Sequence, residues 1–283
     1  MRDIRRVAVL GAGTMGHGIA HAAMAGGFET RIFDVSPSAL EKAVAAIGGI
    51  VAMGIELGKV AKDEGDAIRA RLSTFDALPA AVEDADFVIE AAPERIDLKL
   101  GLLREVEAHA PPAAVIASNT SALSITEMAG SLSNPSRVAG MHFFNPVHKM
   151  KLIEIVQALA TAPETLEAVE TVSRRMGKET VLVRESPGFI TSRVNATIGN
   201  EAFYMLQEGV ASARDIDKAL KLGLNHPMGP FELVDLVGLD TRLSVLEFLH
   251  RTLGEKYRPC PLLVQYVKEG RLGRKVGRGV YDY

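Results

Sequence analysis

Cysteine is almost absent from this sequence, because Cys260 is the only one in 283 residues. A single thiol cannot close a disulfide within the chain, and it cannot supply the several sulfur ligands of a cysteine-based metal site. Secreted domains of modest size commonly carry paired cysteines. We therefore expect no metal and a reducing, cytoplasmic location.

Long runs of one charge and long apolar runs are also missing. The formal net charge is −3, which predicts neither a nucleic-acid partner nor an anionic membrane partner. The basic start followed by small residues imitates a secretory signal, but glycines and histidines interrupt its core, and we reject that interpretation. No later uncharged run predicts a membrane span. The expected partner is a small molecule.

The first 185 or so residues alternate short apolar runs with helical patterns. The expected strands are 7–10, 29–34, 86–92, 114–119, 137–143, 151–156 and 180–185. Helical stretches lie between them, including one from about Pro37 to Lys59 and another from Arg95 to His109. This alternation predicts an α/β fold, with a doubly wound, largely parallel Rossmann-type sheet and helices on both faces.

The pattern changes at the segment "RESPGFI", where Ser186 is suited to cap a helix whose first turn holds Pro187. Beyond it, apolar residues recur almost wholly at helical spacing. We predict a nucleotide-binding domain over residues 1–185, with a helical arm near residues 50–72, and an all-helical domain over residues 186–283. The many apolar residues of the second domain predict substrate binding and burial against a second subunit in a homodimer.

Gly11, Gly13 and Gly16 form a G-x-G-x-x-G motif directly after the first expected strand and at the start of a helix. In this context the first glycine permits a tight turn, the second lets a pyrophosphate approach the backbone, and the third lets helix and strand pack closely. The helix N-terminus offers unpaired N–H groups to phosphates. Thr14 and Met15, between the glycines, therefore join the expected cofactor site.

The second expected strand ends in Asp34, about twenty residues beyond the glycines, where it can accept hydrogen bonds from an adenosine ribose. A carboxylate there repels a 2′-phosphate, and no arginine follows it closely, which favours NAD over NADP. A glycine-rich turn with an incidental aspartate is the alternative, and the order of strand, glycines, helix, strand and acid argues against it. We assign no chemistry to His17 and His21 in the same helix.

The segment "GMHFFNPVHKMKLIEI" contains the candidate acid/base, because hydride transfer to NAD needs a neighbouring group to take the hydroxyl proton, and His142 is suited to that task. Glu154 stands twelve residues later on the next apolar run, where a buried carboxylate needs a partner. Adjacent strands would bring the two side chains together. The carboxylate would then fix the imidazole tautomer and stabilise its charged form.

A hydroxyl-rich turn follows another expected strand in "ASNTSALSI", at the sheet edge where open α/β folds bind ligands. Ser121 is a candidate to bind the substrate hydroxyl, and Asn119 or Asn145 to hold carbonyl or amide groups. Each residue also has a plain structural interpretation. His142 is then a packed core histidine, Ser121 a helix cap and Glu154 a half-exposed strand residue.

Seven stretches taken together resemble one known family. They are "VAVLGAGTMGHGIA", "FVIEAAPE", "ASNTSALSI", "GMHFFNPVHKMKLIEI", "SPGFITSR", "NHPMGPFELVDLVGLDT" and "GRKVGRGVYDY". From end to end the chain resembles the short-chain L-3-hydroxyacyl-CoA dehydrogenases, including the bacterial 3-hydroxybutyryl-CoA dehydrogenases. The resemblance implies NAD-dependent oxidation of an L-3-hydroxyacyl-CoA, or the reverse reduction. It implies that His142 is the acid/base, that Glu154 orients it and that Ser121 binds the 3-oxygen.

The resemblance also implies further cofactor contacts. It places Glu94, Lys99 and Asn145 near the nicotinamide half of NAD, and Lys275 corresponds to a lysine that approaches the cofactor in some members. Without the resemblance, Glu94 and Lys99 indicate a solvated helix start, and Lys275 indicates a basic tail.

Two features bear on the acyl-CoA substrate. Lys59 and Lys62 resemble the helical arm that contacts CoA phosphates in this family, and a solvated charged hairpin is the alternative. Many members have an asparagine directly before the arginine of the Pro-Gly-Phe motif, where this chain has Ser192. Serine is shorter and offers fewer hydrogen bonds, so the substrate carbonyl is held differently or Asn195 compensates.

Two other functions remain open at this point. One is a dehydrogenase of free hydroxy acids or sugar acids, similar to the gulonate dehydrogenases related to lambda-crystallin, which has no CoA handle. The other is a non-catalytic NAD-binding protein, which would need none of Ser121, His142 and Glu154.

Overall fold

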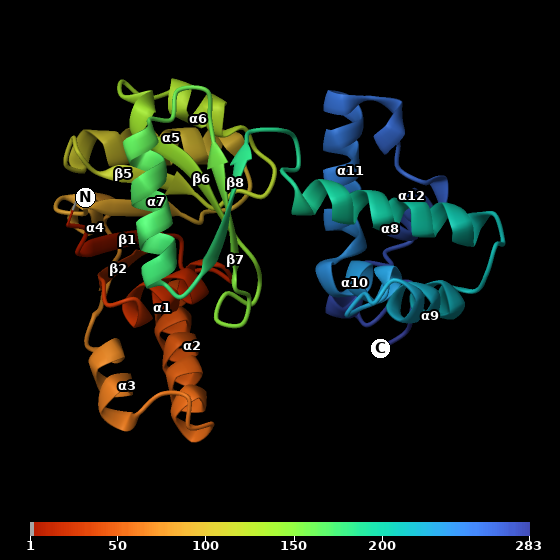
Figure 1. Cartoon of the computed structure of the whole chain (residues 1–283), viewed down its shortest axis with the longest axis horizontal. Helices are drawn as coiled ribbons and strands as arrows, with labels where there is room; N and C mark the ends of the chain where they lie inside the picture. Colours follow the sequence, from red (N-terminus) through yellow and green to blue (C-terminus); the bar gives the residue numbers. More distant parts are fainter. Residues whose placement is uncertain (1–2) are drawn as a thin grey trace. The chain divides into compact units, whose positions relative to one another are not determined.

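The computed structural model describes residues 3–283, and these form two compact units that divide between Glu185 and Ser186. Unit 1 is built on one eight-stranded sheet (Figure 1). Its strands are β1 (Arg6–Leu10), β2 (Glu29–Phe33), β3 (Leu72–Phe75), β4 (Phe87–Glu90), β5 (Val115–Ser118), β6 (Val138–Phe143), β7 (Leu152–Gln157) and β8 (Glu179–Arg184).

The strand order is β3-β2-β1-β4-β5-β6-β7-β8. Every neighbouring pair is parallel except β6 and β7, which are antiparallel. The last two strands therefore run against the other six. The chain winds outward from β1 in both directions, so the strand order reverses between β1 and β4, where open α/β sheets bind ligands.

Helices cover both faces of the sheet (Figure 1). One face carries α1 (Gly16–Ala25), α2 (Pro37–Glu56) and α7 (Pro163–Arg175), and strand side chains such as Val9, Ile89 and Met141 join them in the main apolar core. The other face carries α4 (Leu78–Val82), α5 (Ile96–His109) and α6 (Ile125–Gly130). The predicted fold class is confirmed.

Unit 1 differs from expectation at one helix end and in one strand. The helix expected to reach Lys59 ends at Glu56, because Gly58 adopts a left-handed conformation with φ of 66° and stops it. The strand β3 was not expected. This four-residue edge strand exposes Ser73 and Thr74, so it lacks the apolar run that marks the other strands.

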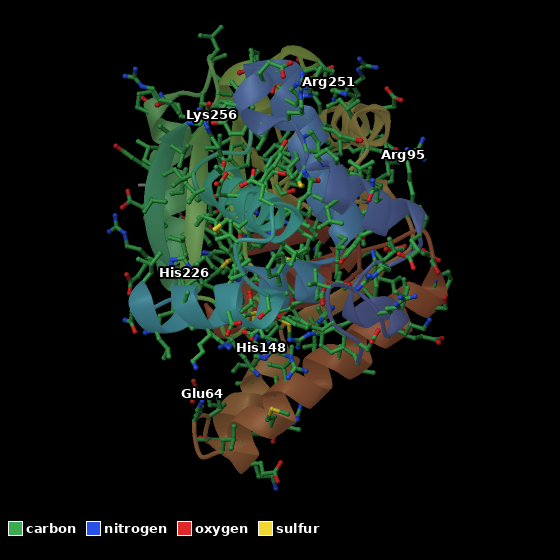
Figure 2. The ribbon with its side chains drawn as sticks, turned by 90° about the vertical axis from the view of Figure 1, so that its right-hand side faces the viewer. Glu64, Arg95, His148, His226, Arg251 and Lys256 are labelled. Carbon is green, nitrogen blue, oxygen red and sulfur yellow. The ribbon has the colours of Figure 1, made fainter. Side chains whose placement is uncertain are left out.

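The hairpin of α2 and α3 (Lys62–Arg69) projects beyond the sheet (Figure 1), with Glu64 near its end (Figure 2). By length and composition alone α2 could cross a membrane, since it has 20 residues and an 18-residue window within it has a mean hydropathy of 1.5. The sequence contains no uncharged run that predicts this span, because charged residues lie within the helix. Four side chains of α2 are buried in the core of unit 1, namely Leu40, Ala43, Ile47 and Val51.

Unit 2 is helical. Its helices are α8 (Thr191–Gln207), α9 (Ala213–Gly223), α10 (Pro230–Val237), α11 (Leu239–Leu253) and α12 (Pro261–Lys268). The predicted cap at Ser186 is wrong, because Gly188 and Phe189 both have positive φ and form a turn before α8 begins. Phe203 and Phe231 meet edge to face in its core, with ring centroids 5.2 Å apart.

Candidate functional site

The glycine loop joins β1 to α1 and is shaped by close backbone contacts. A Cβ at Gly11, where φ is 103°, would lie 2.7 Å from the carbonyl oxygen of Ala91, and a Cβ at Gly16 would lie 1.7 Å from that of Gly11. At Gly13, by contrast, no atom lies within 4 Å of the place a Cβ would occupy. The loop therefore has open space beside the N-terminus of α1, and Met15 at the N-cap position makes no side-chain cap there.

Asp34 follows β2 directly and is held by two backbone amides. Its Oδ2 accepts a hydrogen bond from the Ala12 N–H at 2.8 Å, and its Oδ1 accepts one from the Ser36 N–H at 2.9 Å. The open loop, the uncapped helix N-terminus with Thr14 exposed beside it, and this fixed carboxylate fit the pyrophosphate and adenosine ribose of NAD.

His142 and Glu154 lie directly opposite each other on the antiparallel strands β6 and β7. Glu154 Oε2 lies 2.7 Å from His142 Nδ1, and the side chains are buried, with 7% of His142 and none of Glu154 exposed. A carboxylate can only accept here, so Nδ1 carries the proton and Nε2 has the lone pair that can take another. The interpretation of Glu154 as half-exposed is therefore wrong.

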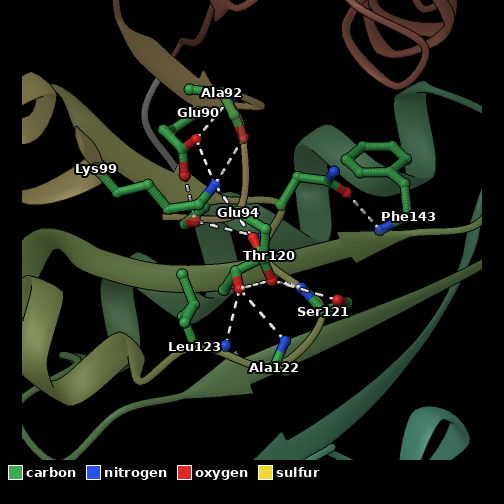
Figure 3. Close-up of polar contacts among 11 residues, drawn as sticks. Glu90, Ala92, Glu94, Lys99, Thr120, Ser121, Ala122, Leu123 and Phe143 are labelled. Carbon is green, nitrogen blue, oxygen red and sulfur yellow. Dashed lines mark hydrogen bonds and ion pairs between the residues drawn. The ribbon is translucent and has the colours of Figure 1, made fainter. Parts of the chain in front are cut away.

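The turn after β5 is tied to the end of β6 and to the loop after β4. Asn119 Oδ1 accepts a hydrogen bond from the Phe143 N–H at 2.9 Å, next to His142 in the chain. Glu94 Oε1 accepts hydrogen bonds from the Thr120 hydroxyl at 2.5 Å, the Ser121 N–H at 3.0 Å and the Ser121 hydroxyl at 3.2 Å (Figure 3). Glu94 thus holds the turn that presents the Ser121 hydroxyl.

Ser121 is not a helix cap. The N-cap of α6 is Ser124, whose hydroxyl accepts a hydrogen bond from the Glu127 N–H at 3.1 Å.

Lys99 is buried, with 1% of its surface exposed, so its interpretation as part of a solvated helix start is wrong. Its ammonium group donates to Glu90 Oε1 at 2.6 Å and to the Ala92 carbonyl oxygen at 3.0 Å, and it lies 3.4 Å from Glu94 Oε2 (Figure 3). Glu90, at the end of β4, is wholly buried. Glu90 was not among the predicted residues, although a lone carboxylate in the apolar run "FVIEAA" requires a partner, as Glu154 does.

Two further predicted cofactor residues have less definite positions. Asn145 is exposed in the loop after β6. Lys275 belongs to unit 2, where both carboxylate oxygens of Asp240 accept hydrogen bonds from its ammonium group at 2.6 Å.

The other predicted substrate residues lie on α8 and where the α2–α3 hairpin turns. Ser192 is in the first turn of α8 and Asn195 lies one turn later on the same helix. Lys59 follows α2 and Lys62 begins α3, and both are exposed where the hairpin turns.

A dinucleotide loop together with a carboxylate-supported histidine is the arrangement of a dehydrogenase that acts on a hydroxyl or carbonyl group. Residues 6–186 match the model for the 3-hydroxyacyl-CoA dehydrogenase NAD binding domain, and residues 188–283 match that for the C-terminal domain of the same family. The chain belongs to the 3-hydroxyacyl-CoA dehydrogenase family, it is an enzyme, and its cofactor is NAD.

Individual relatives agree over nearly the whole chain. It is 47% identical to a probable 3-hydroxybutyryl-CoA dehydrogenase of Bacillus subtilis, over 99% of this chain and 98% of the relative. It is 43% identical to a 3-hydroxybutyryl-CoA dehydrogenase of Bradyrhizobium diazoefficiens, over 99% and 96%. The crystal structure of (S)-3-hydroxybutyryl-CoA dehydrogenase from Ralstonia eutropha matches with a TM-score of 0.96 and 42% identity, over 99% of each chain. These comparisons do not favour a sugar-acid dehydrogenase or a non-catalytic protein.

Proposed function

We propose that this enzyme oxidises the L-3-hydroxyl group of 3-hydroxybutyryl-CoA to the 3-keto group with NAD, and catalyses the reverse reduction. The observation that carries the proposal is the buried hydrogen bond between His142 and Glu154, beside a turn that presents the Ser121 hydroxyl. The names of its relatives support the acyl group.

The acid/base chemistry follows from this geometry. NAD, held by the Gly11, Gly13 and Gly16 loop and by Asp34, supplies the hydride acceptor when it is bound. His142 Nε2 takes the proton of the 3-hydroxyl group, and in the reverse direction returns it to the 3-oxygen. Glu154 stabilises the imidazolium that forms and keeps the ring in the tautomer that can accept a proton.

Ser121 orients the substrate oxygen. Its hydroxyl can donate to the 3-keto oxygen or accept from the 3-hydroxyl group. Asn119, Glu94, Lys99, Asn145 and Lys275 complete the proposed cofactor site.

The CoA moiety is assigned to the arm formed by α2 and α3. Lys59 and Lys62 are exposed cations that can contact the CoA phosphates as point charges. Ser192, or Asn195 one helical turn away, is assigned to the acyl portion of the substrate. We also propose that the enzyme is a cytoplasmic homodimer, which light scattering of the purified protein tests.

The experiment that tests the function follows the loss of NADH absorbance with acetoacetyl-CoA. Free acetoacetate and NADPH serve as parallel substrate and cofactor. Fast turnover with NADH and the CoA ester alone supports the proposal, and a series of longer 3-oxoacyl-CoA esters then measures the chain-length preference. Equal turnover of free acetoacetate would show that CoA is not recognised. No turnover with any pair would contradict the proposed reaction.

A further inference from the structure

Glu90, at the end of β4, forms a buried ion pair with Lys99 and has no assigned role of its own in the reaction. Glu90 is 0% and Lys99 is 1% exposed, and Glu90 Oε1 lies 2.6 Å from Lys99 Nζ. Glu90 also accepts hydrogen bonds from the Ser118 hydroxyl at 2.5 Å and from the Ala92 N–H at 2.6 Å. Every acceptor and donor of the pair is therefore engaged within unit 1.

A buried ion pair of this kind contributes little to the free energy of unfolding. Removing two charges from water costs free energy that their attraction barely offsets, and apolar residues of similar volume are often as stable or more so. Glu90 nevertheless lies where strand order reverses, paired in register with Leu10 of β1 and Ser118 of β5. Its position indicates a role at the ligand-binding edge of the sheet.

The ion pair reaches the substrate turn through one further carboxylate. The Lys99 ammonium group lies 3.4 Å from Glu94 Oε2, while Glu94 Oε1 accepts the three hydrogen bonds from Thr120 and Ser121 (Figure 3). One oxygen of Glu94 thus faces the buried cation and the other faces the turn. Glu94 therefore lies between Lys99 and the turn that carries Ser121.

We propose that Glu90 is a positioning residue for Ser121, acting through Lys99 and Glu94. The negative charge of Glu90 keeps the Lys99 ammonium group at the end of β4, so that it restrains Glu94 without drawing it away from the turn. When that charge is removed, the whole attraction of Lys99 falls on Glu94, which leaves the Ser121 hydroxyl. The inference rests on the proposed function, in which Ser121 binds the 3-oxygen of the substrate.

The test is a double-mutant comparison in the full-length enzyme. Glu90→Gln, Ser121→Ala and the combined variant are assayed for kcat and KM with acetoacetyl-CoA and NADH, with NADH affinity measured by fluorescence and Tm by calorimetry. Glu107→Gln is the control, because Glu107 lies in the last turn of α5, the helix that carries Lys99, and forms an ion pair with Arg137 at 3.3 Å, away from the substrate turn.

We expect Glu90→Gln to lower kcat/KM for acetoacetyl-CoA about tenfold at saturating NADH, which keeps any change of cofactor affinity through Lys99 and Glu94 apart from the effect on Ser121. In the Ser121→Ala background the same change should cost no further activity, because residues that act as one unit are not additive. Glu107→Gln should lower Tm and leave kcat/KM unchanged.

Independent, multiplying losses in the combined variant would overturn the inference. So would a Glu90→Gln enzyme that, like the control, loses only thermal stability. If Glu90→Gln does not fold, Glu90→Asp takes its place. The shorter carboxylate holds the Lys99 ammonium group less closely, so kcat/KM should fall by less than tenfold, and it should not fall further in the Ser121→Ala background. An inactive wild-type enzyme would overturn the proposed function and this inference together, whereas an active one isolates the role of Glu90.

Discussion

His142 and Glu154 form their hydrogen bond away from bulk water, since neither residue is exposed by more than 7%. In such surroundings the attraction between imidazolium and carboxylate is stronger than it is in water. In the proposed reaction, this attraction offsets the charge that His142 gains when it accepts the proton of the substrate. We therefore propose that the carboxylate on β7 stabilises the imidazolium.

His142→Gln should abolish most of the activity and leave the cofactor bound. Glutamine can still donate a hydrogen bond to Glu154, but it cannot take a proton, so we expect kcat to fall about 10²- to 10⁴-fold. NADH affinity should change less than twofold. Steady-state kinetics with a parallel NADH fluorescence titration measures both quantities. Turnover within tenfold of the wild type would show that another group is the acid/base.

At the scale of single residues, the sequence predicted those whose chemistry conflicts with their surroundings. A histidine and a glutamate in apolar runs indicated a pair, and the structure shows their hydrogen bond. Glu90 is also a carboxylate in an apolar run, but its pairing with Lys99 was not predicted. Lys99 lies in the first turn of α5, and the sequence of one helical turn does not show which of its side chains are buried. The Asp240 partner of Lys275 could not be predicted either, because 35 residues separate them.

Helix α1 contains a histidine whose pKa is moved by its position. Burial, followed by the positive groups His148, Lys178 and His17, lowers the pKa of His21 to about 4 from 6.5. Within residues 3–283, its Nδ1 has no hydrogen-bond partner. His148 lies in the loop after β6 (Figure 2). The folded protein therefore favours the neutral imidazole.

The lowered pKa of His21 makes the free energy of unfolding depend on pH. As pH falls through 6.5 the unfolded chain binds a proton at His21 before the folded protein does, so the free energy of unfolding decreases until pH reaches about 4. We expect the wild type to lose up to about 3 kcal/mol more than His21→Gln over this range. Urea unfolding of both proteins at several pH values between 7.5 and 4.5 measures the difference. Parallel curves would contradict the expectation.

The α2–α3 hairpin offers a test of CoA recognition. Replacing Lys59 and Lys62 together by alanine should raise KM for acetoacetyl-CoA about 5- to 30-fold, because each exposed cation contributes up to about 1 kcal/mol to phosphate binding. The KM for NADH should not change, and the effect should shrink at high ionic strength. Lys268→Ala, an exposed lysine in unit 2, is the control. An unchanged KM for acetoacetyl-CoA would show that Lys59 and Lys62 do not contact the CoA moiety.

At the scale of elements, buried strands were predicted well and edges poorly. All four residues of β4 are buried, and the three before Glu90 form a continuous apolar run. By contrast, β3 lies at the edge of the sheet and exposes half its residues. The reversal at β7 was also predictable in principle. Only eight residues connect β6 to β7, and a parallel crossover needs about a dozen or more.

Cofactor binding should be visible in the stability of the whole protein. Gly13→Val places its side chain in the open space beside the α1 N-terminus, so we expect an unchanged Tm without ligand. At 100 times the dissociation constant, NADH should stabilise the wild type by about 2.7 kcal/mol and raise its Tm by about 5–10 °C. The variant should lose this shift, because the valine occupies the space required by the pyrophosphate.

Gly16→Ala serves as the control for Gly13→Val, because it alters the same loop at a position with no free space. Its added Cβ would lie 1.7 Å from the Gly11 carbonyl oxygen, so this variant should have a lower Tm even without ligand. A Gly13→Val enzyme that keeps the full NADH shift would place the pyrophosphate elsewhere.

The whole fold was predicted from the alternation of strands and helices, and the reaction from the resemblance of motifs spread along the chain. The spacing of apolar residues alone could not have distinguished this reaction from those of other enzymes with the same type of sheet. The difference lies in a few side chains such as His142, and a packing pattern does not record which proton a buried histidine transfers.

The reversed direction of β7 has a consequence for how this enzyme can diverge. Because β6 and β7 form one hairpin, His142 and Glu154 belong to a single short piece of chain, with Met141–Ile155 and Phe143–Ile153 as the flanking pairs. A one-residue deletion within β7 would turn the Glu154 carboxylate to the opposite face. The connecting loop is fixed as well, because Val147 is buried in the core and its carbonyl oxygen accepts a hydrogen bond from the Lys178 ammonium group. Changes of sequence that keep the pair must therefore keep the length of this hairpin, which makes residues 138–157 a single unit for redesign in the laboratory.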